Sequence, residues 1–292
     1  MLHSALLNVM IKAAHRAGRG LKRDLGEVEK LQVSVKGPGN FVTAADRRAE
    51  EIVREELAKA RPAYGFLGEE GGLRAGTDKS QRWIVDPLDG TTNFLHGIPH
   101  FAVSIALERN GIIVAGVTYN PANDELFVAE RGKGAFLNNQ RIRVAGRRRL
   151  GEAIVGCGLP HHGRGDLQLS RAELAAVQGH FAGLRRYGAA TLDLAWVAAG
   201  RLDSYWERNL SPWDMAAGII LVREAGGYVS DLDGGESIFA TTNIIAGNET
   251  MHRELLRLLA EAGKASVTSS SATPPAAISP SATPRSATPP TT

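Results

Sequence analysis

WIVDPLDGTTNF, residues 83–94, joins a short apolar run to two aspartates and a turn that contains glycine. Residues 82–86 predict a buried strand that stops at the following proline, because proline lacks the N–H group that a central β-ladder needs. Asp86 and Asp89 then project from the strand end into a turn. A helix can begin at Gly90-Thr91, where free backbone N–H groups favour an anion. The stretch therefore predicts two carboxylates beside a phosphate site.

The sequence around this stretch mixes helical and strand-like periods. Three segments have the spacing of helices: residues 47–60, 191–199 and 213–225. Alternating apolar residues on both sides of Asn110-Gly111 predict a hairpin. A further strand pair is expected around residues 125–143, with its turn near Asn138-Asn139. Because consecutive hairpins argue against a purely parallel sheet, we expect an α/β fold with helices layered on mixed sheets.

Two more acidic segments accompany the central stretch. Glu69 and Glu70 lie in a glycine-rich turn after an apolar run, and Asp214 lies at the start of the helix expected over residues 213–225. The acids of all three segments offer hard oxygen atoms, and none of the three segments contains a Cys or a His. This donor set favours Mg²⁺ or Mn²⁺ over Zn²⁺.

Each acidic segment also has an ordinary structural interpretation. Asp89-Gly90 is a common turn, and Glu69-Glu70 alone is typical of an exposed loop. Asp214 can be the acid of a capping box led by Ser211, with Pro212 at the first helical position. Only the joint occurrence of the three segments, in this order, favours a metal site.

Two known phosphatase motifs and a zinc site fit the sequence less well than a site of hard oxygen ligands. Asp86 and Asp89 are three residues apart, whereas aspartyl-phosphate enzymes need Asp-x-Asp. No Cys-x₅-Arg loop surrounds Cys157, which is expected to be a small buried residue. His96 and His100 have the spacing of a zinc-binding helix, but a glycine and a proline between them disfavour that helix.

The composition is that of an ordinary globular protein of 292 residues, 43% apolar and 22% charged. A net charge of +3 is too small for a nucleic-acid-binding stripe. No run approaches the roughly 20 apolar residues of a membrane span. The single cysteine excludes an intrachain disulfide and agrees with a reducing compartment, so we expect a cytoplasmic location.

The two ends of the chain differ in character. Leu2, Leu6, Val9 and Ala13 fall at helical spacing and predict a docking helix, in preference to a cleaved presequence. Residues 1–264 read as one folded catalytic domain, with approximate halves 1–145 and 146–264. Ser-Ala-Thr-Pro recurs three times after that point. Residues 265–292 are therefore expected to form a disordered tail, because they have almost nothing to bury.

DPLDGTTNF at 86–94 and WDMAAG at 213–218 together resemble the inositol monophosphatase family, which belongs to a wider group with the fructose-1,6-bisphosphatases. The resemblance covers nearly all of residues 5–262. Supporting matches are Gly68-Glu69-Glu70, Asn40 to Asp46, and Gly200 to Asp203. It implies a five-layer α-β-α-β-α sandwich, a homodimer, and a Mg²⁺-dependent, Li⁺-sensitive phosphatase.

The resemblance also implies roles for individual residues. The metal ligands would be Glu69, Asp86, the Leu88 carbonyl, Asp89 and Asp214. The catalytic residues would be Glu69, Asp86 and Thr91. The substrate contacts would be Asp89, Gly90, Thr91, Gly188, Ala190, Glu207 and Asp214. Two Mg²⁺ ions, or three, would support in-line attack of water on the phosphate, with Mn²⁺ as a substitute.

The substrate and the partners stay open at this point. Inositol 1-phosphate is the expected substrate, and histidinol phosphate, fructose 1,6-bisphosphate and nucleotide 3′-phosphates are alternatives. The segment Gly188 to Thr191 lacks the first hydroxyl of the family's commoner Gly-Ser/Thr-Ala-Ala. A further alternative is a role as an RNA-processing or transcription partner, for which the basic residues Arg141, Arg143 and Arg147 to Arg149 are the only sign. The presence of every expected metal acid favours an enzyme.

Overall fold

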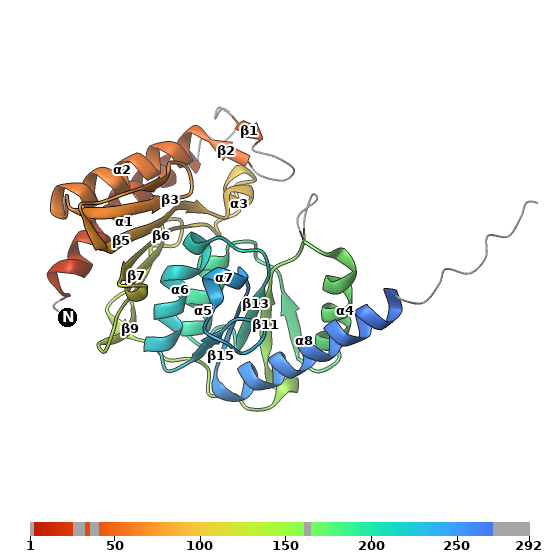
Figure 1. The fold of residues 1–292 in the computed structure, drawn as a ribbon. Coiled ribbons are helices and arrows are strands. Elements are labelled where there is room, and N and C mark those ends of the chain that lie inside the picture. The colour runs from red at the N-terminus through yellow and green to blue at the C-terminus, as the bar shows by residue number, and fades with distance from the viewer. Residues whose placement is uncertain (1–2, 26–32, 36–40, 161–164, 271–292) are drawn as a thin grey trace, which may run out of the picture.

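The computed structural model describes residues 3–25, 33–35, 41–160 and 165–270, and these form five alternating layers (Figure 1). The outer layer on one side holds α1 (Ala5–Leu25) and α2 (Ala44–Ala60). An eight-stranded sheet follows, then the central helices α5 (Ala190–Ala198) and α6 (Pro212–Glu224), then a five-stranded sheet. Helices α4 (Leu167–Gln178) and α8 (Glu249–Ser270) close the far side. The expected five-layer sandwich with mixed sheets is confirmed.

The eight-stranded sheet has the order β10-β9-β8-β7-β6-β5-β3-β4. Its strands are β3 (Tyr64–Gly68), β4 (Gly72–Arg74), β5 (Asp78–Asp89), β6 (Ala102–Arg109), β7 (Ile112–Asn120), β8 (Glu125–Glu130), β9 (Gly134–Leu137) and β10 (Gln140–Arg141). Only the β3–β5 pair is parallel. The predicted hairpin joins β6 to β7, and both of its turn residues, Asn110 and Gly111, have positive φ angles.

The region around residues 125–143 differs from its prediction, because it contains three strands and not two. The first turn, between β8 and β9, falls at residues 131–133, and the predicted turn at Asn138-Asn139 joins β9 to β10. Both asparagines adopt positive φ angles, which this residue type tolerates well.

The five-stranded sheet has the order β12-β11-β13-β15-β14. Its strands are β11 (Ile154–Cys157), β12 (Gly183–Arg185), β13 (Ser204–Glu207), β14 (Tyr228–Ser230) and β15 (Ile244–Gly247). Strand β11 runs parallel to β12 and β13, whereas β15 is antiparallel to β13 and β14. The remaining elements are β1 (Val33–Val35), β2 (Phe41–Thr43), α3 (Thr91–Leu95), the short 3₁₀ helix Leu150–Glu152 and α7 (Ile238–Thr241).

Strand β5 does not stop at Pro87, as the sequence predicted, but continues to Asp89. Asp86 pairs with Ser104 and Asp89 pairs with Ala102, so the two residues of β5 between these pairs, 87 and 88, lie opposite the single residue 103 of β6. Pro87 lies inside this irregularity, where the ladder requires no N–H group from it. The bulge carries the strand, with both of its aspartates, beyond the predicted end.

The central helices are buried between the two sheets and depend on glycines for close packing. A Cβ atom on Gly116 of β7 would lie 2.6 Å from Cγ2 of Ile220, and one on Gly218 of α6 would lie 2.4 Å from Cδ1 of Leu194. Residues of α5 and α6 and the inner face of the large sheet form one apolar cluster. This layer brings residues 190–214 against the end of β5.

The N-terminal helix α1 packs on α2 and the large sheet, as a docking helix was expected to do, but with another face. Of the four predicted contact residues, Ala13 is fully buried, Leu6 and Val9 are half-buried, and Leu2 lies outside the described residues. The fully buried face is formed by Leu7, Met10, Ala13, Ala14, Ala17 and Leu21.

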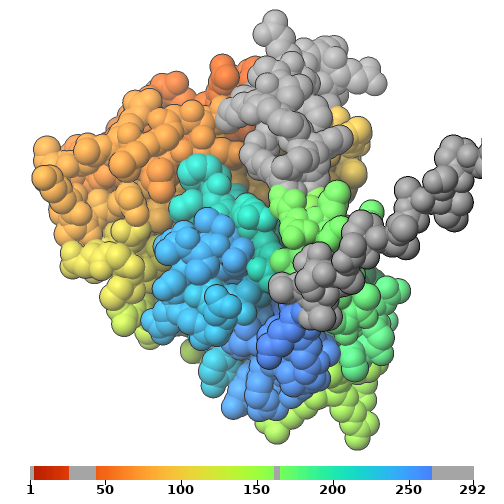
Figure 2. Space-filling model, turned by 45° about the vertical axis from the view of Figure 1, so that its right-hand side comes forward, coloured from red at the N-terminus to blue at the C-terminus, as the bar shows by residue number. Residues whose placement is uncertain are grey.

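Helix α8 packs against α4, and its blue surface lies beside the green surface of α4 in Figure 2. The helix extends to Ser270, past the predicted start of the tail at residue 265. Residues 271–292 lie outside the described part of the chain, and so does most of the predicted tail. Within the described residues, no helix combines the length and apolar character that a membrane span requires.

Candidate active site

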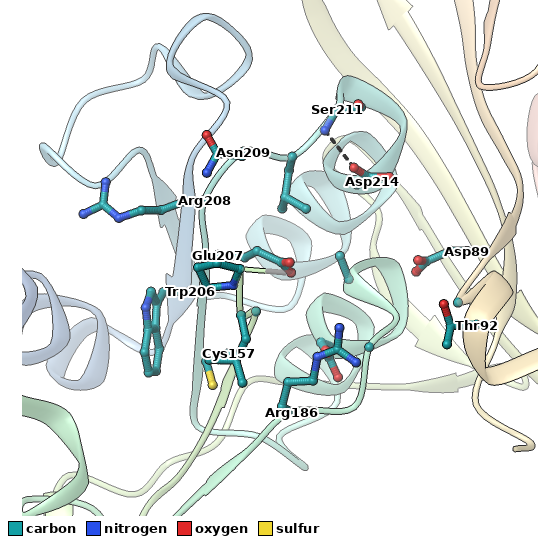
Figure 3. Close-up of a pocket in the computed structure, with 18 of the residues that line it drawn as sticks. Asp89, Thr92, Cys157, Arg186, Trp206, Glu207, Arg208, Asn209, Ser211 and Asp214 are labelled. Atoms are coloured by element: carbon teal, nitrogen blue, oxygen red, sulfur yellow. Dashed lines mark hydrogen bonds between the residues drawn. The ribbon is translucent and has the colours of Figure 1, made fainter. Parts of the chain in front are cut away.

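A pocket of about 490 Å³ lies where the end of β5 and α3 meet β13, α5 and α6. Its wall is drawn from chain segments that are far apart in sequence, residues 69–92, 157–160, 166–173 and 186–214. Every residue for which the sequence predicted a site role lines this one pocket: Glu69, Asp86, Leu88, Asp89, Gly90, Thr91, Gly188, Ala190, Glu207 and Asp214. Figure 3 shows the carboxylates of Asp89, Glu207 and Asp214 turned toward a common space.

The turn after β5 is shaped by Gly90, which has a φ angle of 83° in the left-handed region. A Cβ atom there would also lie 2.9 Å from the carbonyl oxygen of His100, so glycine is required on two grounds. Helix α3 begins at the next residue, as predicted, and the Thr91 hydroxyl donates to the Leu88 carbonyl at 2.9 Å. The turn thus presents the Leu88 carbonyl and the Thr91 hydroxyl to the pocket.

Asp86 is the most deeply buried of the four predicted metal-ligand carboxylates, with 2% of its surface exposed. Its Oδ1 accepts a hydrogen bond from the N–H of Leu88 at 3.0 Å. Burial raises the pKa of Asp86 well above its usual range, and the neighbouring charges of Glu69 and Asp89 raise it further. Several acids therefore repel one another here across a short, poorly solvated space.

Asp89 is held by the N-terminal end of α5. Its Oδ2 accepts hydrogen bonds from the N–H of Thr191 at 2.8 Å and from the Thr191 hydroxyl at 2.6 Å. Burial raises the pKa of Asp89, and these hydrogen bonds oppose the rise. The contact spans 102 residues of sequence and ties the large sheet to the central helices.

Asp214 combines both of the interpretations that its sequence allowed. Its Oδ2 accepts the N–H of Ser211 at 2.7 Å, which makes it the acid of the capping box at the start of α6. It also lines the pocket, where burial and then the charge of Asp89 raise its pKa. The first turn of α6 therefore directs a capping acid into the pocket.

Glu69 enters the pocket from the turn between β3 and β4. Its N–H donates to the carbonyl of Val85 at 3.3 Å, which places it beside the strand that carries Asp86. The neighbouring Glu70 forms an ion pair with Arg47 at 3.4 Å. Of the two adjacent glutamates, only Glu69 lines the pocket.

Glu207, at the end of β13, faces the acids from the opposite wall (Figure 3). It accepts a short hydrogen bond from the hydroxyl of Tyr205, and burial raises its pKa to about 7. A Cβ atom on Gly158 would lie 1.9 Å from the Glu207 carboxyl carbon, so only glycine leaves room for this side chain.

Residues 3–265 match the inositol monophosphatase family. The chain belongs to this family. An inositol-1-monophosphatase of Mesorhizobium japonicum is 61% identical over 257 residues, which cover 88% of this chain and 97% of the relative. A protein of Pseudomonas aeruginosa named Nus factor SuhB is 44% identical over 258 residues, covering 86% of this chain and 94% of the relative.

The solved structures agree with this assignment. The crystal structure of the extragenic suppressor protein suhB from Bartonella henselae matches with a TM-score of 0.85 at 59% identity. The match covers 88% of this chain and 98% of that one. The protein is therefore a phosphatase with the layered fold of the family, a hydrolase of phosphoric monoesters.

The donor set of the phosphatase pocket fits a hard divalent cation. Four carboxylates and a backbone carbonyl supply oxygen atoms only. Burial, and then the charges of the neighbouring acids, raise the pKa values of Asp86 and Asp214, and a bound cation would offset both effects. Within the described residues, no three His, Cys, Asp or Glu side chains form a ready-made metal cluster. Asp86, Asp89 and Asp214 each accept a backbone N–H instead. The pocket gathers the donors without arranging them as a closed shell.

The sequence did not single out three residues of the site: Arg186 and Asp193, which line the pocket, and Thr191, which holds one of its acids. Thr191 holds Asp89, although its segment had drawn attention only for the hydroxyl missing at Ala189. Arg186 brings a positive charge into the pocket, and no sequence pattern marked it (Figure 3). Asp193 lies 3.7 Å from the ring of His100, and burial raises its pKa to about 6.

The structure also places the residues of two minor hypotheses, the zinc-binding helix at His96 and His100 and the buried Cys157. His96 follows the end of α3, so it does not share a helix with His100. Cys157 is buried at the end of β11, as expected, with 3% of its surface exposed.

Proposed function

We propose that this phosphatase hydrolyses inositol 1-phosphate, or a closely related small polyol phosphate, in a reaction that requires Mg²⁺. The observation that carries the proposal is the gathering of four acids from three chain segments in one pocket, with Glu207 on the opposite wall. The name of the Mesorhizobium relative supports inositol 1-phosphate as the first substrate to test.

Two sets of donors would hold two ions. Glu69, Asp86 and the Leu88 carbonyl would bind the first, with the Thr91 hydroxyl beside them. Asp86, Asp89 and Asp214 would bind the second, and a third ion near Glu69 is compatible with the same acids. Bound Mg²⁺ supplies an activated water and neutralises charge on the phosphate and the leaving oxygen, and Mn²⁺ can replace it.

The protein groups around the acids would position the reactants. Thr91 and Glu69 would orient the attacking water, and the N–H groups of Gly90 and Thr91 would bind phosphate oxygens. Glu207 would accept hydrogen bonds from the hydroxyls of the polyol, while Gly188 and Ala190 leave space for its ring. Since water attacks the phosphorus directly, no phosphoenzyme forms.

The test is phosphate release from a substrate panel with and without Mg²⁺. The panel holds inositol 1-phosphate, histidinol phosphate, fructose 1,6-bisphosphate and a nucleotide 3′-phosphate. We expect hydrolysis of inositol 1-phosphate that needs Mg²⁺ and that millimolar Li⁺ inhibits. Preference for another panel member would replace the substrate, and activity in excess chelator would refute the metal requirement. Size-exclusion chromatography checks the expected homodimer.

A second candidate function is a role in transcription, because a 44% identical relative is named as a Nus factor. The basic residues that such a role would use are exposed, but Arg147 is already paired with Asp203 at 2.7 Å and Arg149 with Glu152 at 3.2 Å. Co-purification of RNA polymerase subunits with the tagged protein, lost when Arg141, Arg143 and Arg148 become alanine, would support it. Full phosphatase activity without any such partner favours the enzyme as the main role.

A further inference from the structure

Glu50 on α2 is a buried carboxylate outside the pocket, with 6% of its surface exposed. Two other acids of this helix form ion pairs, Glu56 with Lys12 and Arg16, and Glu51 with Arg54. Glu50 instead faces the turn between β3 and β4. Its Oε2 accepts the backbone N–H of Glu70 at 2.8 Å, and the N–H of Gly71 also donates to it.

The turn is built closely around this carboxylate. A Cβ atom on Gly68 would lie 2.4 Å from Oε2 of Glu50, and one on Gly71 would lie 2.6 Å from Oε1. Both positions must therefore be glycine as long as the carboxylate stays in place. Burial raises the pKa of Glu50, so holding a charged oxygen here is costly unless the N–H groups of the turn compensate for it.

The three residues of the turn, Glu69 to Gly71, lie between the paired residues Gly68 and Gly72. The N–H of Glu69 bonds to Val85 of the neighbouring strand, whereas those of Glu70 and Gly71 bond to Glu50. One side of the turn is thus fixed by the sheet, and the other by α2, through the Glu50 carboxylate and the ion pair between Arg47 and Glu70. Glu50 binds the backbone of the turn from which the Glu69 side chain projects.

We propose that Glu50 is a positioning residue that holds the Glu69 turn against α2 and thereby orients Glu69 for Mg²⁺. The inference rests on the proposed function in so far as Glu69 binds the ion. Removing a residue that orients a metal ligand without touching the metal typically lowers the metal affinity about 10- to 100-fold. A purely structural Glu50 would change stability and leave Mg²⁺ affinity unaltered.

The experiment compares Glu50→Gln, Glu50→Ala and Gly71→Ala in the full chain. Glu50→Gln keeps one acceptor oxygen but places an amide N–H₂ group against a backbone N–H of the turn. Glu50→Ala removes both acceptor oxygens. Gly71→Ala adds a methyl group to the turn that displaces the Glu50 carboxylate. Gly71 has no positive φ angle, so its backbone accepts alanine. Glu51→Gln, an exposed acid one position along the same helix, is the matched control.

Two readouts are made without substrate. Hydrogen exchange of the peptide that spans residues 69–72 should accelerate in all three variants. Mg²⁺ affinity, measured by calorimetry, should fall about 10- to 100-fold in Glu50→Ala. The affinity of Glu50→Gln should lie between that of Glu50→Ala and that of the wild type. The Glu51 variant should match the wild type in both. If Glu50→Ala fails to fold, the isosteric Gln variant and Gly71→Ala carry the test.

Unchanged Mg²⁺ affinity in folded variants whose exchange is accelerated would overturn the proposal in favour of a structural role. Unchanged exchange would overturn the hydrogen-bonding argument itself. A wild-type protein that binds Mg²⁺ but releases no phosphate from the substrate panel would instead refute the proposed function, and the two failures are thus distinguishable.

Discussion

Replacing Glu207 by glutamine should stabilise the metal-free protein at alkaline pH. Burial raises the pKa of this carboxyl from its ordinary 4.5 to about 7, so the folded protein binds more protons than the unfolded chain between these values. Stability therefore falls as the pH rises through this window. The difference between the two pKa values corresponds to about 3 kcal/mol of unfolding free energy. This figure is an upper limit, because the side chain faces the pocket. We expect Glu207→Gln to gain about 1–3 kcal/mol at pH 8.

The assay is urea unfolding in excess EDTA at several pH values between 4.5 and 8, for the wild type and the variant. Glutamine keeps the shape of the side chain and an oxygen for the Tyr205 hydroxyl. The difference between the two proteins should be small near pH 4.5 and should grow up to about pH 7. Glu51→Gln, on the exposed side of α2, is the control and should show no such growth.

A difference that does not vary with pH, or a variant that is less stable at pH 8, would refute this reasoning. The same variant has an independent expectation in the metal-bound enzyme. Because Glu207 lies across the pocket from the proposed metal ligands, Glu207→Gln should raise KM or change the preferred substrate while the Mg²⁺ requirement stays nearly constant.

Three further outcomes are expected. Asp86→Asn should lower kcat by at least about 10²-fold in a phosphate-release assay, since one neutralisation weakens both proposed ion sites; turnover like the wild type would exclude the two-ion arrangement. Gly158→Ala places a Cβ atom 1.9 Å from the Glu207 carboxyl carbon, so steady-state kinetics should show a raised KM, and an unchanged KM would contradict that contact. Cys157, whose pKa burial raises to about 12, should resist thiol reagents at pH 8 until urea unfolds the chain, and rapid native labelling would contradict its burial.

The local parts of the site could be predicted from sequence because the chain builds them within a few residues. The strand before Asp86, the helix start after Gly90 and the capping box at Ser211 each depend on neighbours at most four positions away. Their residue types also indicated their chemistry, which is that of oxygen donors for a cation and N–H donors for an anion. Their meeting in one pocket followed only from the resemblance to a family, and not from any spacing.

The parts that could not be predicted depend on distant contacts. Thr191 bonds to Asp89 across 102 residues, and nothing near either residue signals this bond. The face of α1 was misjudged because the helix carries two neighbouring apolar stripes, and the buried one is the stripe that approaches the large sheet closely. A Cβ atom on Gly18 would lie 2.5 Å from the ring of Tyr119. The continuation of β5 past Pro87 depends on the register of its partner strand, which no single segment encodes.

The placement of α5 and α6 between the two sheets has a consequence for the order of synthesis. These helices cover the inner face of the large sheet, on which Ile84 and Phe127 lie, yet the last residue of α6 follows the end of β10 by about 80 positions. At about 5–20 residues per second, a ribosome needs roughly 4–16 s to make that length. During this interval the nascent chain holds an apolar sheet face that α5 and α6 do not yet cover in full. The ribosome-bound N-terminal half is therefore the form of this protein most in need of a chaperone.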